Sequence, residues 1–199
     1  MKKIRNILLV SLLVLVLSGC GKKVSKTDNK EKKVDAMEVG KKVLVNSFKI
    51  DYINKSFGLP IENNSEPVGK DGKTWYKVDT KEFKSIKDIE ALIDKTYTSE
   101  KAKEAKKALN AKYMMIDGNI YTVSQSECVF EVNYKYADNI ASQLLESAEL
   151  SNNKITITVS GKKYELTNKN GNWLLSESVF TCEWILKGRV YNIWINYMY

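Results

Sequence analysis

The chain has 199 residues, 43% hydrophobic and 28% charged, a composition that suits one globular domain and excludes collagen, low-complexity disorder and polytopic membrane proteins. It contains no histidine, which excludes Ser-His and Cys-His nucleophile systems and imidazole-ligated zinc, and it makes an enzyme a poor hypothesis. Of the net charge of +8, residues 1–35 carry +6, so the body is nearly neutral and nucleic acid is not an expected partner.

Residues 1–19 have the pattern of an export signal. A basic start precedes an apolar run over residues 7–17, and eleven residues are too few for a lasting transmembrane helix, which needs about 20. The sequence Leu17-Ser18-Gly19-Cys20 resembles the lipobox of bacterial lipoproteins, in which the cysteine is lipidated and becomes the new N-terminus. We therefore expect Cys20 to anchor the protein to the outer face of the bacterial cell membrane through palmitate-like acyl chains. The alternative is an ordinary secretory signal with an incidental cysteine.

Residues 20–35 begin with the lipidated cysteine and continue as a flexible tether, because they are polar, rich in lysine and free of aromatic side chains. Residues 36–199 are then expected to form a single domain. Its two cysteines, Cys128 and Cys182, would lie on the oxidising side of the membrane, and they are either bridged or two small buried hydrophobic residues. Two thiols without a histidine are a poor metal site, and no cofactor or metal is expected.

The first half of the body has the pattern of helices. Apolar residues recur at helical spacing over residues 34–57. Residues 58–72, with both prolines and three glycines, are expected to form a loop and a candidate contact surface. A strand over 73–79 follows, then a helix that begins with a capping box at Ser85 and Asp88, and another that begins at Thr98 or Ser99 and ends near Asn110.

After Lys112 the periodicity changes to two. Asp117-Gly118 predicts a hairpin between strands 113–116 and 119–123, because a type I′ turn needs positive φ at both central residues. Further strands are expected over residues 128–134, 154–159, 163–167 and 172–178, while residues 135–150 fit either helix or strand. Residues 181–199 are expected to form a hairpin around Lys187-Gly188 or an aromatic surface for a partner. The fold class is therefore α+β, with N-terminal helices packed on a curved antiparallel sheet.

The body from about Gly72 to Ser178 resembles the IseA family, which inhibits bacterial cell-wall DL-endopeptidases. Short patterns over about half of the chain carry the resemblance, and cystatin-like and NTF2-like folds share the same order of helices and sheet. The patterns are Gly72-Lys73-Thr74-Trp75-Tyr76, Tyr97-Thr98, Tyr113, Ile116-Asp117-Gly118-Asn119-Ile120-Tyr121, the strand over 155–159 and Gly171-Asn172-Trp173.

The resemblance implies a non-enzymatic surface protein that blocks the active cleft of NlpC/P60-type peptidoglycan hydrolases with a loop and so restrains autolysis. This inhibitory loop would fall near residues 124–139, where apolar Cys128-Val129-Phe130 follows the polar start. The alternative for this segment is a plain connection between strands. The residues expected to contact the hydrolase are Ser124, Gln125, Ser126, Glu127, Tyr134 and Tyr136.

A second hypothesis is a lipoprotein that binds a small ligand in an NTF2-like conical pocket. Its aromatic lining would come from Trp75, Tyr113, Phe130 and Trp173. A deep pocket with converging polar groups would favour this hypothesis, and a filled core would count against it. The sequence holds no phosphate-binding glycine loop, nucleophile elbow or metal-ligand motif that would indicate an enzyme.

Overall fold

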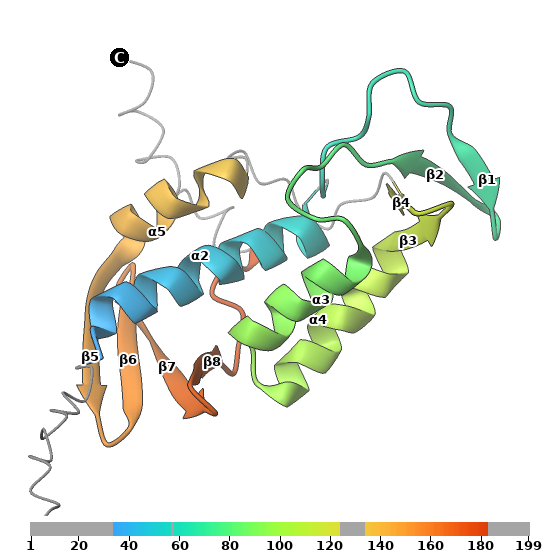
Figure 1. Cartoon of the computed structure of the whole chain (residues 1–199). Helices are drawn as coiled ribbons and strands as arrows, with labels where there is room; N and C mark the ends of the chain where they lie inside the picture. Colours follow the sequence, from blue (N-terminus) through green and yellow to red (C-terminus); the bar gives the residue numbers. More distant parts are fainter. Residues whose placement is uncertain (1–33, 57, 124–133, 183–199) are drawn as a thin grey trace, which may run out of the picture. The chain divides into compact units, whose positions relative to one another are not determined.

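A long helix, α2 (Ala36–Lys55), runs through the middle of the domain in the computed structural model, which describes residues 34–56, 58–123 and 134–182 (Figure 1). Asp35 caps the helix, because its side chain accepts hydrogen bonds from Met37 N at 3.0 Å and Glu38 N at 3.1 Å. The predicted helix is confirmed. Its buried side includes Leu44, Phe48 and Ile53.

Two shorter helices follow, α3 (Ile86–Thr96) and α4 (Ser99–Lys112). The predicted capping box opens α3, where the Asp88 carboxylate accepts a hydrogen bond from Ser85 N at 2.9 Å. Thr98 is the N-cap of α4, which ends two residues later than predicted. Both helices pack against α2.

A small antiparallel sheet has the strand order β1-β2-β4-β3. Its strands are β1 (Val68–Lys70), β2 (Lys73–Lys77), β3 (Tyr113–Ile116) and β4 (Asn119–Thr122). The hairpin at Asp117-Gly118 is confirmed, with φ of 47° and 77°. The prediction of a continuous loop over residues 58–72 was wrong at its end, because Asp71-Gly72 also has positive φ and turns β1 back onto β2.

A second antiparallel sheet has the order β5-β6-β7-β8. Its strands are β5 (Leu145–Ser151), β6 (Lys154–Val159), β7 (Lys162–Lys169) and β8 (Asn172–Leu175). Ser160-Gly161 and Asn170-Gly171, which have positive φ values, form the turns between β6, β7 and β8. The strand predicted over 172–178 stops at Leu175, whose carbonyl instead accepts a hydrogen bond from Thr98 N.

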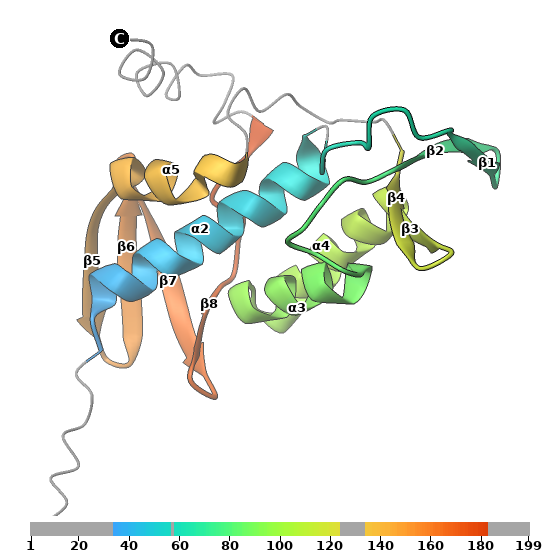
Figure 2. The ribbon, with the colours of Figure 1, turned by 45° about the horizontal axis from the view of Figure 1, so that its top comes forward.

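The segment that fitted both helix and strand contains both. Residues 134–136 form a 3-10 helix, η1 (Tyr134–Tyr136), which is followed by α5 (Ala137–Leu144) and then by β5. Figure 2 shows α5 lying alongside α2, and Lys41 forms an ion pair with Asp138 across the two helices. The predicted strand over 128–134 and the hairpin at Lys187-Gly188 fall on residues outside the described ones.

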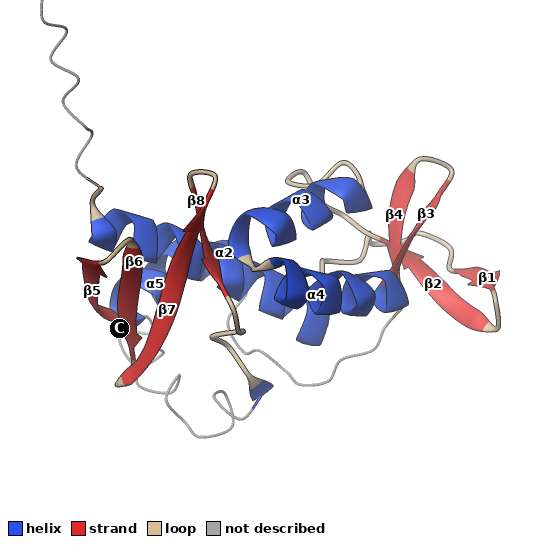
Figure 3. Cartoon of the chain, turned by 90° about the horizontal axis from the view of Figure 1, so that it is seen from below, coloured by secondary structure: helices blue, strands red, loops and turns tan. Residues whose placement is uncertain are grey.

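Helix α2 packs against one face of the second sheet, and this contact forms part of the core (Figures 2 and 3). Gly40 permits the close approach, since a Cβ built at this position would lie 2.8 Å from Ile157 Cγ2. Ile155, Ile157 and Val159 point into this core and are fully buried. The fold is therefore α+β, with helices packed on a curled antiparallel sheet, consistent with a cystatin/NTF2-like arrangement.

Candidate functional site

The helix η1 presents one of its two predicted contact residues to solvent. Tyr134 is partly buried, and its ring packs against Tyr52 with centroids 5.6 Å apart. Tyr136 is 45% exposed, and Lys135 Nζ lies 5.0 Å from the centre of its ring. Tyr134 thus holds η1 on α2, while Tyr136 is available to a partner. The other predicted contact residues, Ser124, Gln125, Ser126 and Glu127, lie outside the described residues.

An acidic side chain lies near this helix. Burial raises the pKa of Tyr134 most, the negative charge of Glu82 raises it further, and a hydrogen bond with Thr80 lowers it. Glu82 is itself held by Lys49, with 2.6 Å between Nζ and Oε1. We call Tyr134, Lys135, Tyr136 and Glu82 the η1 surface. It combines an exposed tyrosine ring, a type of side chain enriched in protein interfaces, with one cation and one carboxylate.

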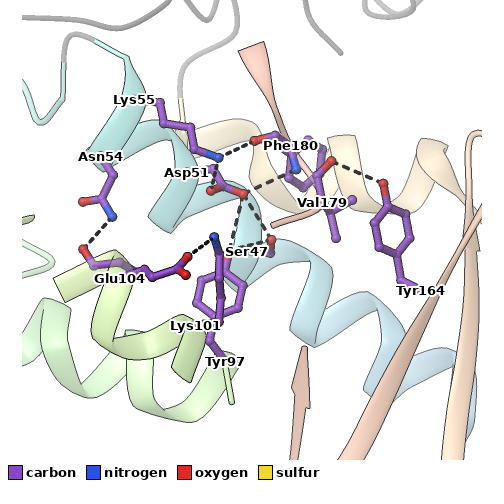
Figure 4. A network of polar contacts seen from close by, with 11 residues as sticks. Ser47, Asp51, Asn54, Lys55, Tyr97, Lys101, Glu104, Tyr164, Val179 and Phe180 are labelled. Carbon is purple, nitrogen blue, oxygen red and sulfur yellow. Dashed lines mark hydrogen bonds and ion pairs between the residues drawn. The ribbon is translucent and has the colours of Figure 1, made fainter. Parts of the chain in front are cut away.

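A buried polar network lies further inside, on α2 (Figure 4). Asp51 is 2% exposed, and its Oδ1 is 2.8 Å from Lys55 Nζ. Its Oδ2 accepts hydrogen bonds, each at 3.4 Å, from Ser47 Oγ, Tyr97 Oη and Phe180 N. Both carboxylate oxygens are therefore engaged.

Burial dominates the electrostatics of this network. It raises the pKa of Asp51 above the ordinary value for an aspartate, although the charge of Lys55 acts in the opposite direction. The pKa of Tyr97 is held well above its usual range, mainly by burial and then by the charge of Asp51. At neutral pH Tyr97 is consequently a neutral hydrogen-bond donor.

The network fastens residues 178–180 to the rest of the domain. Lys55 Nζ donates to the carbonyl of Phe180 at 2.9 Å, and Tyr164 Oη donates to the carbonyl of Val179 at 3.5 Å. The ring of Phe180 also meets Phe48 edge to face at 5.0 Å. Because the Asp51 oxygens are satisfied inside the protein, we assign this carboxylate a structural role. Sequence reasoning missed it, and the only local signal was the spacing of four between Asp51 and Lys55.

Of the two cysteines predicted to form a pair, only Cys182 is among the described residues. Cys182 is disulfide-bonded, and it lies two residues after the fastened Phe180. Cys20 and Cys128 both fall outside the described residues. A bridge between Cys128 and Cys182 therefore stays a prediction.

The aromatic residues that were expected to line one pocket come from two sheets, Trp75 and Tyr113 from the first and Trp173 from the second. Tyr113 is buried with its hydroxyl engaged, donating to Ile53 O at 3.2 Å and accepting from Leu59 N at 3.0 Å. Trp75 lies in β2 of the small sheet, where its Nε1 donates to Lys70 O, whereas Trp173 lies in β8 of the second sheet (Figure 1). Phe130 lies outside the described residues, and the aromatic pocket stays a hypothesis.

Residues 34–56, 58–123 and 134–182 hold no candidate for a membrane-spanning helix or a metal-binding group. None of the helices there has both the length and the apolar character needed to cross a bilayer. Nowhere in the same ranges do three or more acidic or cysteine side chains gather into a group that could hold a metal ion.

A comparison of the sequence with known protein families and with curated proteins finds no match.

Proposed function

We propose that this chain is a lipid-anchored, non-enzymatic protein of the bacterial cell surface that binds and restrains a peptidoglycan hydrolase, a DL-endopeptidase of the NlpC/P60 type. Cys20, at the end of a lipobox-like motif, supplies the membrane anchor. Residues 124–136 supply the contact with the hydrolase.

The observation that carries this proposal is the geometry of η1. Tyr136 is 45% exposed at the end of the segment that the resemblance assigns to the hydrolase, and Tyr134 fixes the helix on Tyr52. An exposed tyrosine next to such an anchored residue is favourable for binding, since tyrosine buries a large area at a small cost in side-chain entropy.

The test is an inhibition assay with purified residues 21–199, which include the whole compact unit that begins at Val34. We expect near-stoichiometric inhibition of at least one DL-endopeptidase acting on peptidoglycan. If no member of a panel of NlpC/P60 enzymes is inhibited or retained by the immobilised protein, the hydrolase is not the partner.

Two variants then test whether the hydrolase contacts the η1 surface or another exposed part of the protein. Tyr136→Ala should raise the inhibition constant about 10- to 30-fold, the usual effect of truncating a tyrosine that dominates an interface. Met115→Ala is the matched control, because Met115 is also a large exposed apolar side chain, at 38%, but lies in β3. Equal inhibition by both variants would exclude η1 as the contact.

A further inference from the structure

Strand β5 forms an open edge of the second sheet. It pairs only with β6 among the described strands, and it lies at the margin of the sheet in Figures 1 and 3. The first two residues, Leu145 and Glu146, are irregular, because a register shift separates Leu145 from Ser147. Residues 147–151 are regular.

The turn after β5 determines which main-chain groups face outward. Ser151 and Lys154 flank the two-residue turn Asn152-Asn153, so they form a hydrogen-bonded pair. The pattern alternates along an antiparallel ladder, and Ala148 and Leu150 therefore direct their N–H and C=O groups away from β6. No hydrogen bond from the part of the chain that the structure describes reaches these four groups.

The side chains on this edge are available as well. Leu150 is 47% exposed, and Glu149 is exposed without an ion pair in the described ranges. Glu146 differs, since its carboxylate accepts a hydrogen bond from Gly161 N at 2.9 Å. Glu149 is thus the unpaired charge beside an open row of main-chain donors and acceptors.

We propose that the edge of β5 is a strand-addition site for an extended segment of a partner protein that places a lysine or arginine opposite Glu149 and an apolar side chain beside Leu150. Main-chain hydrogen bonds to Ala148 and Leu150 supply affinity, and the side chains supply selectivity. Opposite charges that face each other across two strands stabilise the pair, whereas like charges destabilise it. This site rests on β5 alone and does not depend on the proposed hydrolase.

The same charge keeps two copies of the chain from pairing here. A two-fold pairing that uses only residues 147–151 must be centred on Glu149, which sets Glu149 of one copy against Glu149 of the other. This is a non-hydrogen-bonded position, where Cα atoms approach to about 4.5 Å. Centring the pair on Ala148 or Leu150 would bring in the irregular start or the turn residue Asn152, whose φ is 48°. Charged residues on edge strands commonly prevent such self-association.

The experiment uses a charge-reversed copy, Glu149→Lys in residues 21–199, as the basic strand. Its mass in solution is measured by analytical ultracentrifugation alone, with the unchanged protein, and with rising salt. We expect each protein alone to be monomeric and the mixture to form a 1:1 complex that salt weakens, because only the mixture places a lysine opposite Glu149. A mixture that stays monomeric, or association of either protein alone to the same extent as the mixture, would overturn the proposal.

A second variant tests whether the contact uses the main chain. Leu150→Pro in the charge-reversed copy removes the outward N–H, and proline is tolerated on an edge strand where that group faces solvent. The complex should be lost while the thermal unfolding temperature stays close to that of the charge-reversed copy. A complex that survives with full affinity would show contact through charge alone and would overturn strand addition.

If the proline variant is unfolded, Leu150→Asp in the charge-reversed copy replaces it. This variant keeps the main-chain N–H but replaces the apolar side chain with a charged one, so it should weaken the complex at least tenfold. Unchanged affinity would count against the site.

Discussion

At the scale of single residues, Asp51 shows how a buried charge is tolerated. Its desolvation is unfavourable, and Lys55 and the hydrogen bonds to the carboxylate offset it only in part, since the pKa stays raised. A buried ion pair contributes little net stability, but loss of the acceptor would leave Phe180 N without a partner. It would also leave one of the Ser47 and Tyr97 hydroxyls, which lie 3.0 Å apart, without an acceptor for its proton. The acceptor therefore matters more than the charge.

This reasoning predicts different effects for two substitutions. Asp51→Ala should lower the free energy of unfolding by about 2–4 kcal/mol, because it removes the acceptor for several buried donors. Asp51→Asn keeps an acceptor and should cost less than about 1 kcal/mol. Urea unfolding measures both, and Glu165→Ala, which breaks the exposed pair with Lys154, is the control that should have little effect. Equal losses for the alanine and asparagine variants would assign the effect to the charge instead.

The pH dependence has a definite sign. Because the pKa of Asp51 is raised above the value of 3.8 that we take for the unfolded chain, the folded protein binds more protons at this site between the two pKa values. The stability that Asp51 contributes is fully present below pH 3.8 and is lost as pH rises through its folded-state pKa. The unfolding free energy of the unchanged protein should thus fall relative to Asp51→Asn as pH rises through that window. A difference that rises instead would contradict the raised pKa.

At the scale of elements, the contact between α2 and the second sheet depends on one residue without a side chain. A glycine inside a helix normally costs stability compared with alanine. Gly40 is retained where a Cβ would meet Ile157 Cγ2 at 2.8 Å and Ala148 Cβ at 3.4 Å. Ile157 is fully buried and β-branched, so it has little freedom to move aside.

Gly40→Ala should therefore destabilise the protein by about 1–3 kcal/mol despite the better helix propensity of alanine. Thermal or urea unfolding gives the value, and Lys42→Ala, on the exposed side of the same helix, is the matched control that should be nearly neutral. Gly40→Ala combined with Ile157→Ala should cost less than the sum of the two single changes, since the cavity accommodates the new methyl group. Stabilisation by Gly40→Ala alone would show that the two elements move apart without cost.

At the scale of the whole molecule, the proposal places a structured domain after a short lysine-rich segment that begins at Cys20. The compact unit starts at Val34, fourteen residues after that cysteine. Fourteen residues can span at most about 50 Å when fully extended. If Cys20 is lipidated as proposed, Val34 would therefore lie at most about 50 Å from the membrane anchor.

Expression of the full chain in a bacterial host tests the anchor. Cys20→Ser should shift the protein from the membrane fraction to the soluble exported fraction, because acylation at this position contributes about 0.8 kcal/mol per buried methylene. Cys128→Ser is the matched control, since it also removes a thiol but should leave the protein in the membrane fraction. Membrane association that persists in Cys20→Ser would exclude the lipid as the anchor.

The local sequence predicted those features that depend on interactions between residues close together in the chain. The periodicity of α2, the capping box of α3 and the turn at Asp117-Gly118 follow from interactions over a few residues, and all are present. Of the candidate site, the sequence indicated Tyr134 and Tyr136 but gave no sign that one would be anchored and the other exposed.

Tertiary structure decided the rest. Asp51 meets Tyr97 and Phe180 across 46 and 129 positions of the chain, and no local pattern encodes such a contact. The sequence did not distinguish helix from strand over residues 135–150 for the same reason. Ile140 lies in α5 and Leu145 lies in β5, and both are buried in the core. Trp75 and Trp173, which the sequence could not place relative to each other, belong to different sheets. Burial and hydrogen bonding between distant segments fix these features, and they exist only once the chain has folded.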